Sequence, residues 1–113
     1  ACRFINNLAK NKIMNDSFKN IINSETPVLI DFFATWCGPC QTLGPILKDV
    51  KETLGDQISI IKIDVDKNQI LASQYNVRGV PTMILFKNGN QVWRQSGVLS
   101  KNDIVKIIQE QSA

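Results

Sequence analysis

The feature that most restricts the fold of this chain is an apolar segment that leads straight into two closely spaced cysteines. Residues 28–33 read Val-Leu-Ile-Asp-Phe-Phe, and residues 36–40 read Trp-Cys-Gly-Pro-Cys. A short run of branched and aromatic residues is typical of a central strand that is buried on both faces. Apolar residues at helical spacing follow, with Leu43, Leu47 and Val50 on one face. The chain is therefore expected to pass from a buried strand into a helix whose first turn carries both thiols.

The other segments predict strands and helices in alternation, with a hairpin near the end. Residues 58–65 form the second expected strand, because Ile and Val recur there around polar residues. Asn88-Gly89 predicts a tight turn between strands at 82–86 and 91–95, since both residues accept positive φ angles. Helices are expected from Phe18 after the capping residues at 15–17, at 37–54, at 67–75 and after the cap Ser100. This order predicts an α/β fold with a mixed central β-sheet, parallel βαβ units followed by an antiparallel hairpin, and helices on both faces.

Length and composition suit one compact domain over residues 1–113. No internal repeat or linker divides the chain, and residues 1–14 are expected to be an N-terminal extension or to hold a weak edge strand. The net charge of +3 is spread evenly, and no basic run is interleaved with aromatic residues, which argues against a nucleic-acid partner. No apolar stretch approaches the roughly 20 residues that span a bilayer, so a membrane span is not expected.

The chain contains three cysteines and no histidine. This composition excludes Cys/His zinc sites, haem ligation by imidazole and every Cys-His or Ser-His catalytic pair. A structural zinc site needs four ligands, and Cys2 is the one thiol left beside Cys37 and Cys40, so no metal site is expected. Haem attachment would require a histidine after Cys40, where Gln41 stands. The pair is therefore interpreted as a dithiol that can close to a disulfide, the alternative being two core cysteines without a chemical role.

The two cysteines are expected to differ in role. Cys37 lies at the helix start, where unpaired N–H groups and the positive end of the helix dipole lower a thiol pKa below its free value of about 8.5. Cys40 lies one turn further on, so the prediction is an exposed nucleophile and a buried resolving thiol. Asp31 stands mid-strand among apolar residues, where burial should raise its pKa and suit proton transfer near neutrality. A purely structural, hydrogen-bonded Asp31 is the alternative.

Trp-Cys-Gly-Pro-Cys after an apolar strand that contains Asp resembles the thioredoxin family. The resemblance continues at Lys62, at residues 78–82 (Arg-Gly-Val-Pro-Thr), at residues 86–89 (Phe-Lys-Asn-Gly) and at Gly97, and it covers nearly the whole chain. It implies the thioredoxin fold and a thiol-disulfide oxidoreductase that reduces protein disulfides. It also implies electrons from a thioredoxin reductase, disulfide-bearing protein substrates, a monomer, and no cofactor besides the redox-active cysteine pair. The Gly-Pro dipeptide between the cysteines is similar to that of family members that act as reductants.

The same resemblance implies roles for individual residues. Cys37 and Cys40 are the implied attacking and resolving thiols, and Asp31 is implied to take the proton of Cys40. Lys62 is the implied neighbour of Asp31 and would oppose part of its pKa shift. The Val80-Pro81 bond is implied to be cis and to pack against the cysteines, where the backbone of Val80 can pair with an extended substrate. The implied substrate-binding rim comprises Trp36, Gly38, Pro39, Val80, Pro81 and Gly97.

Two positions near the cysteines depart from the family pattern. Phe33 stands where the family very often has Trp, and Gln41 replaces a frequent Lys or Arg. The missing positive charge at Gln41 is expected to raise the thiol pKa slightly.

Two other functions remain as hypotheses. One is a dedicated extracytoplasmic thiol reductase, which is disfavoured because such proteins often insert a helix and a strand into the middle of the fold. The other is a non-catalytic binding subunit that serves partners through the docking surface alone. A cytoplasmic location is expected, with a periplasmic location or a lipoprotein anchor at Cys2 as the alternative.

Overall fold

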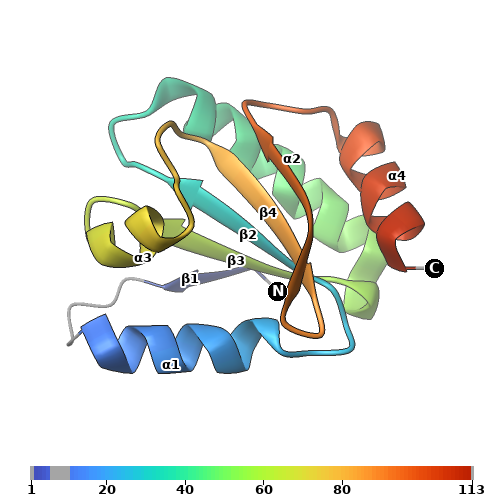
Figure 1. Ribbon diagram of the computed structural model, residues 1–113. Helices are drawn as coiled ribbons and strands as arrows, with labels where there is room; N and C mark the ends of the chain where they lie inside the picture. The colour runs from blue at the N-terminus through green and yellow to red at the C-terminus, as the bar shows by residue number, and fades with distance from the viewer. Residues whose placement is uncertain (1, 6–10, 113) are drawn as a thin grey trace.

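The structure is a computed structural model that describes residues 2–5 and 11–112, which fold into one mixed sheet flanked by helices (Figure 1). The strands are β1 (Cys2–Ile5), β2 (Val28–Phe33), β3 (Ser59–Asp64), β4 (Thr82–Lys87) and β5 (Asn90–Ser96). The helices are α1 (Asn11–Ile22), α2 (Gly38–Leu54), α3 (Gln69–Gln74) and α4 (Lys101–Ser112), with a short 3-10 helix, η1 (Gly55–Gln57).

The sheet has the strand order β1-β3-β2-β4-β5. β1 and β2 both pair in parallel with β3, whereas β4 pairs antiparallel with β2 and with β5. The predicted sequence of parallel units followed by an antiparallel hairpin is confirmed. β1 lies at the edge of the sheet. It falls within residues 1–14, for which either an N-terminal extension or a weak edge strand was predicted.

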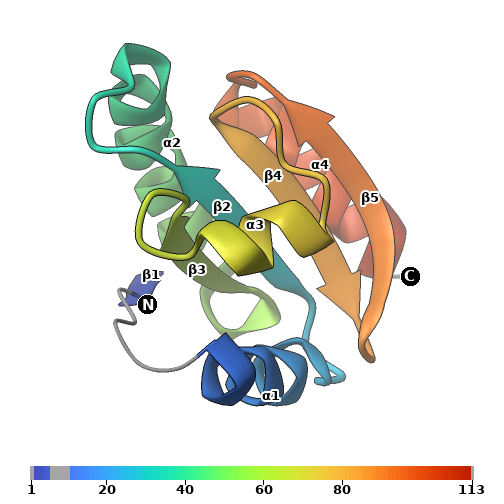
Figure 2. The same ribbon diagram turned by 60° about the vertical axis from the view of Figure 1, so that its left-hand side comes forward.

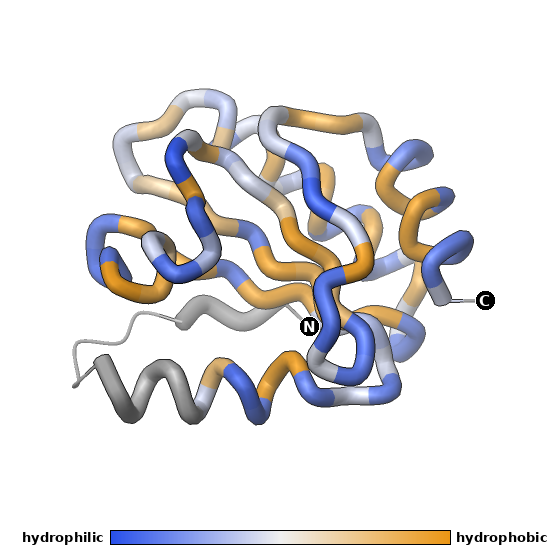
Figure 3. The backbone as a smooth tube through the Cα atoms, in the orientation of Figure 1, coloured by the Kyte–Doolittle hydropathy of each residue, from blue (hydrophilic) through white to orange (hydrophobic). Residues whose placement is uncertain are grey.

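Helices cover both faces of the sheet, as predicted (Figure 2). Side chains alternate between the two faces along each strand. On one face, Ile30 and Ile61 pack with Phe18 of α1 and Leu71 of α3. On the other face, Leu29, Ile60 and Leu85 pack with residues of α2 and α4. Every residue of β2 is buried, which explains why this strand is apolar apart from Asp31, and the hydrophobic colour of the central strands shows the same pattern (Figure 3).

The hairpin between β4 and β5 follows from its two turn residues. Asn88 has φ 53° and Gly89 has φ 82°, the positive values that a tight two-residue turn requires. Ser100 caps α4, because its hydroxyl oxygen accepts the backbone N–H of Asp103 at 3.2 Å. Both features agree with the sequence prediction.

Helix α1 begins earlier than predicted. It starts at Asn11 rather than at Phe18, so the expected capping residues at 15–17 lie inside the helix. Polar residues of these types are typical helix caps but also occur inside helices, so they do not fix the start of α1. The remaining elements agree with their predicted positions to within about two residues at each end.

Candidate functional site

The two cysteines lie where β2 passes into α2. Cys37 is the N-cap residue of α2, with φ −89° and ψ 114°, and its Sγ accepts the backbone N–H of Cys40 at 3.1 Å. Cys37 and Cys40 are joined by a disulfide, with their Cα atoms 5.3 Å apart. The predicted placement of Cys37 at the helix start is therefore confirmed, and its sulfur faces the first-turn N–H groups that stabilise an anion.

The prediction of an exposed Cys37 and a buried Cys40 is wrong for this disulfide form. Each residue is 4% exposed. The reason is that the disulfide draws both sulfurs into a small apolar cluster with Phe33 and Ala34, with Val80 packed against it. The two cysteines differ in their surroundings instead, since the Sγ of Cys37 lies 3.7 Å from the carbonyl oxygen of Val80.

The segment before β4 supplies the opposite wall of the site. The Val80-Pro81 peptide bond is cis, as expected, and Pro81 is buried. The carbonyl of Pro81 accepts the N–H of Gly97 at 2.8 Å, which brings Gly97 beside it. The hydroxyl of Thr82 donates to the carbonyl of Gly79 at 2.6 Å and so holds the segment against the start of β4. The fold thus places Val80 against the disulfide, although 43 residues separate it from Cys37, and Gly97 is bonded to the neighbouring Pro81.

Trp36 forms the exposed wall of a shallow hollow beside the disulfide. Its side chain is 70% exposed, and its indole N–H donates to Asp66 at 2.8 Å. The hollow has a volume of about 110 Å³ and is lined by Trp36, Val65, Val77, Arg78, Gly79 and Val80. Gly38 and Pro39 are exposed in the first turn of α2 and do not line it, and neither does Gly97. Of the six residues predicted to form the substrate-binding rim, Trp36 and Val80 line this hollow, and the rim as a whole stays a prediction.

Five residues of this hollow region were not singled out from the sequence as site residues: Val65, Asp66, Val77, Arg78 and Gly79. Val65 and Asp66 follow β3 directly, and Val77 and Arg78 precede the cis bond. A usable signal exists, because residues after the carboxyl ends of parallel strands meet at one edge of a sheet. The pairing of Trp36 with Asp66 spans 30 residues and carries no local sequence signal.

Asp31 lies in the middle of the sheet beneath α2. It is fully buried and stands in register with Lys62 of β3 on one side and Met83 of β4 on the other. Neither of its carboxylate oxygens has a hydrogen-bond partner among the described residues. This observation disfavours the hydrogen-bonded structural alternative for Asp31. Burial raises the pKa of Asp31 from 3.8 to about 6, and the ammonium group of Lys62 lowers it in part.

Lys62 is half-buried on the same face of the sheet as Asp31. Its Nζ lies 5.3 Å from the centroid of the Phe33 ring. The predicted neighbourhood of Asp31 and Lys62 is therefore present in the structure, and Phe33 belongs to it as well.

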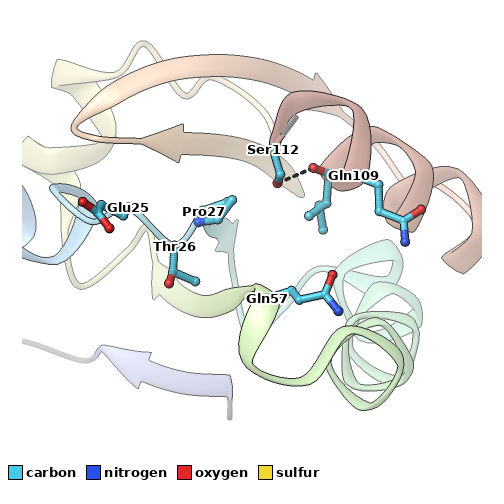
Figure 4. A pocket seen from close by; sticks show the side chains of 7 residues that line it. Glu25, Thr26, Pro27, Gln57, Gln109 and Ser112 are labelled. Carbon is cyan, nitrogen blue, oxygen red and sulfur yellow. Dashed lines mark hydrogen bonds between the residues drawn. The ribbon is translucent and has the colours of Figure 1, made fainter.

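A second hollow, of about 420 Å³, contains no cysteine (Figure 4). It lies between the segment before β2, η1 and the end of α4, where the hydroxyl of Ser112 donates to the carbonyl of Ile108 at 2.6 Å. Its lining includes Glu25, Gln57 and Gln109. The smaller hollow at Trp36 is the one that adjoins the reactive sulfurs, so we take it as the functional site.

Within residues 2–5 and 11–112, no group of three or more Cys, Asp or Glu side chains is placed to hold a metal ion. Among these residues, no helix is both long enough and apolar enough to cross a membrane.

The fold and the site together define a class of domain, in which a Cys-Gly-Pro-Cys disulfide opens a helix and faces a cis-proline. The family model described as Thioredoxin matches residues 9–110. The chain belongs to the thioredoxin family.

Named relatives and a solved structure agree with this assignment. The chain is 47% identical over 94 residues to "Thioredoxin Y, chloroplastic" of Oryza sativa subsp. japonica, covering 82% of this chain and 56% of that protein. It is 40% identical over 96 residues to the thioredoxin of Rickettsia prowazekii (strain Madrid E), covering 84% of this chain and 91% of that protein. A mutant thioredoxin from Halobacterium salinarum NRC-1 superposes with a TM-score of 0.83 at 34% identity, covering 99% of this chain and 91% of that one. The chain thus spans little more than half the length of the rice relative.

Proposed function

We propose that this chain reduces disulfide bonds in other proteins through its Cys37–Cys40 pair. One observation carries the proposal: the disulfide lies at the N-terminus of α2 and against Val80, and the strand that leads into it carries the buried carboxylate of Asp31, which has no hydrogen-bond partner among the described residues. A sulfur at a helix start is a good thiolate, and a carboxyl group with a raised pKa is a good proton acceptor near neutral pH. The two groups together supply what thiol-disulfide exchange requires.

The first step uses Cys37 in the reduced protein. Its thiolate, stabilised by the first-turn N–H groups of α2, attacks one sulfur of a substrate disulfide. The substrate S–S bond breaks and a mixed disulfide forms, while the released substrate thiolate takes a proton from solvent. The carbonyl of Val80 lies beside the attacking sulfur, and we propose that the backbone of Val80 pairs there with an extended substrate segment.

The second step uses Cys40 and Asp31. The carboxylate of Asp31 accepts the proton of the Cys40 thiol, and the resulting thiolate attacks the Sγ of Cys37. The Cys37–Cys40 disulfide reforms, and the second substrate sulfur leaves as a thiolate, so that the substrate has gained two electrons. We propose that a thioredoxin reductase returns two electrons to the pair and that the cycle uses no other cofactor. Lys62 assists by keeping the pKa of Asp31 from rising further.

The substrate is proposed to dock in the hollow at Trp36. The exposed indole and the side chains of Val77 and Val80 offer an apolar contact surface, and Arg78 adds a positive charge at its border. Gly38, Pro39, Pro81 and Gly97 are proposed to contact substrate around this hollow during the mixed-disulfide stage. A shallow surface of this kind binds main chain and admits many partners. We also propose that the chain acts as a monomer.

Reduction of insulin, with dithiothreitol as the electron donor and this protein as the catalyst, tests the proposed function. Cys37→Ser is expected to abolish turnover, because the remaining Cys40 has no partner thiol with which to reform the disulfide. After pre-reduction and removal of dithiothreitol, Cys40→Ser is expected to accumulate a mixed disulfide with insulin, visible on a non-reducing gel, because the resolving thiol is missing. Cys2→Ser serves as the matched control, since it removes the third cysteine and leaves the pair intact. Full turnover by Cys37→Ser would overturn the proposal.

A non-catalytic binding role is a second candidate, because the hollow at Trp36 does not need free thiols to exist. The double variant Cys37→Ser/Cys40→Ser separates the two functions: unchanged support of a partner would favour binding, and loss of that support would favour catalysis. The dedicated extracytoplasmic reductase is less favoured, because the described elements between β2 and β4 are α2, η1, β3 and α3, without an inserted helix and strand.

We propose that the protein works in a compartment that keeps thiols reduced, such as the cytoplasm. The relatives named as chloroplastic make a plastid a competing location. Fractionation of the source cells with an antibody against this chain decides between them. Recovery in a periplasmic fraction would instead support export. Recovery in a membrane fraction would support the lipid anchor at Cys2.

A further inference from the structure

The side chain of Lys62 lies in a slot between the sheet and α2. Lys62 stands directly opposite Asp31 in the parallel pair of β3 and β2, and residues opposite each other in register share a face. That face packs against α2 and α4. The ammonium group lies 5.3 Å from the centroid of the Phe33 ring, within the range of a cation–π contact. Phe33 therefore forms one wall of the slot.

Gly44 of α2 forms a second wall of the slot. It lies inside α2, one turn after Cys40. A Cβ atom placed on Gly44 would lie 3.4 Å from the Nζ of Lys62 and within 4 Å of no other described atom outside the local helix. Glycine is less favourable than alanine inside a helix, and the backbone of Gly44 does not have the positive φ that would require it. The one neighbour that a side chain here would meet is the ammonium group of Lys62.

We propose that Gly44 and Phe33 are positioning residues that seat the ammonium group of Lys62 between α2 and an aromatic ring, at a set distance from Asp31. The inference rests on the proposed function, because Asp31 is the proton acceptor for Cys40 in that mechanism. It assigns a role to Gly44 and Phe33 in addition to the cysteine pair and Asp31.

The direction of the effect follows from the walls of the slot. A methyl group at position 44 would come to 3.4 Å from Nζ, which also lies over the Phe33 ring. We expect the flexible end of Lys62 to give way toward solvent, and so away from Asp31, because Lys62 is half-buried whereas Asp31 is fully buried. An opposite charge near a carboxylate favours its ionised form. Moving that charge away should therefore raise the pKa of Asp31.

Few other ionisable groups face Asp31 and Lys62. From α2, these are Cys37 and Cys40, which are joined in the oxidised protein. From β3, Asp64 shares the face of Lys62, and its Oδ1 accepts the N–H of Asp66 at 2.9 Å. The facing residues of β4 and α4 in this core are apolar, such as Met83 of β4. Lys62 is the one charged group that shifts the pKa of Asp31.

Titration of the Asp31 carboxyl carbon by NMR in the oxidised protein tests the proposal. Gly44→Ala is expected to raise the pKa of Asp31 by about half a unit, and Lys62→Met by more. In the Lys62→Met background, Gly44→Ala should add nothing, because the group that it displaces is absent. Phe33→Leu should act in the same direction as Gly44→Ala. Thr42→Ala is the matched control, since Thr42 is exposed on the same turn of α2 and should leave the titration unchanged.

Two results would overturn the proposal: an unchanged Asp31 titration in Gly44→Ala, or an equal change in the presence and absence of the Lys62 side chain. Misfolding is not a concern for Gly44→Ala, because alanine is favoured inside a helix, and a urea titration verifies this. The NMR titration does not depend on turnover. If the pKa of Asp31 shifts as expected but the protein fails to reduce insulin, the proposed positioning of Lys62 stands and the proposed function is wrong.

Discussion

At the scale of single residues, Asp31 is an exception to the pairing of buried charged groups that a stable fold requires. A buried carboxylate normally has a hydrogen-bond partner or a close ion pair. Asp31 is fully buried, and neither of its oxygens has a hydrogen-bond partner among the described residues. Such local conflicts are expected where a residue serves chemistry rather than stability. The carboxylate should therefore weaken the fold at the pH where it is useful.

This conflict predicts that Asp31→Asn stabilises the oxidised protein at neutral pH. The pKa of Asp31 is about 6 in the folded protein against 3.8 ordinarily, so the folded state binds the proton more tightly than the unfolded chain does. Stability from this group is complete below pH 3.8 and is lost as the pH rises to about 6. The difference between 3.8 and about 6 corresponds to about 3 kcal/mol, which is the upper limit of the gain for Asp31→Asn above pH 7.

Urea unfolding at several pH values measures the effect of Asp31→Asn. The gain should shrink below pH 6 and vanish near pH 4, where the native carboxyl group is also neutral. Asp49→Asn is the control, because Asp49 is exposed on α2 and surface substitutions change stability by about 0.5 kcal/mol or less. A gain that is the same at all pH values would show that ionisation of Asp31 is not its cause.

The residues of the site differ in how far the sequence could predict them. Cys37, Cys40 and Asp31 follow from local patterns: a helix start, a helical turn and a polar residue in an apolar strand. The environment of Lys62 could not be predicted, because it depends on an aromatic ring of β2 and a glycine of α2 that meet only in the folded chain. The equal burial of the two cysteines likewise depends on tertiary packing and on the closed disulfide.

At the scale of elements, the residues at the helix ends determine where the helices begin and end. Cys37 caps α2 through its sulfur, so the residue that starts the helix is also the proposed nucleophile. Gly55 ends α2 with φ 56°, and its N–H donates to the carbonyl of Lys51. The start of α1 was mispredicted because polar residues at 15–17 are typical caps and also occur inside helices.

The cap of α4 predicts a measurable contribution to stability. The Ser100 hydroxyl accepts the N–H of Asp103, and α4 packs through Ile104 and Ile108 against the sheet. Ser100→Ala is expected to lower the free energy of unfolding by about 1 kcal/mol, because one first-turn N–H loses its partner. Ser100→Asp should keep most of the stability. Ser73→Ala in α3 is the control, since Ser73 is exposed; equal losses in both alanine variants would exclude a capping effect.

At the scale of the whole molecule, the residues of the candidate functional site lie at one end of the sheet. The segments that follow β2 and β3 and the segment that precedes β4 lie together at that end and supply the cysteines, Asp66 and the cis-proline (Figure 1). The hollow formed by the segment before β2, η1 and the end of α4 lies elsewhere (Figure 4). Between them, β2 is paired on both edges and covered on both faces. The site is therefore built on loops that a rigid central strand holds in place.

This arrangement predicts a graded pattern of amide hydrogen exchange. The N–H groups of β2 and β4 should exchange only when the whole domain unfolds, because both strands are buried and lie inside the sheet. Protection factors of about 10⁴ or more are expected there, given the ordinary stability of small domains. The amides of α3 and of the edge strand β5 should exchange through local openings, since α3 has six residues and the outer edge of β5 is unpaired among the described strands.

Exchange followed by NMR in rising urea separates the two classes: the exchange rates of β2 amides should depend steeply on urea and those of α3 amides weakly. If α3 were as slow and as urea-sensitive as β2, the loops around the site would unfold only with the whole molecule, and the picture of adaptable loops on a rigid strand would be wrong.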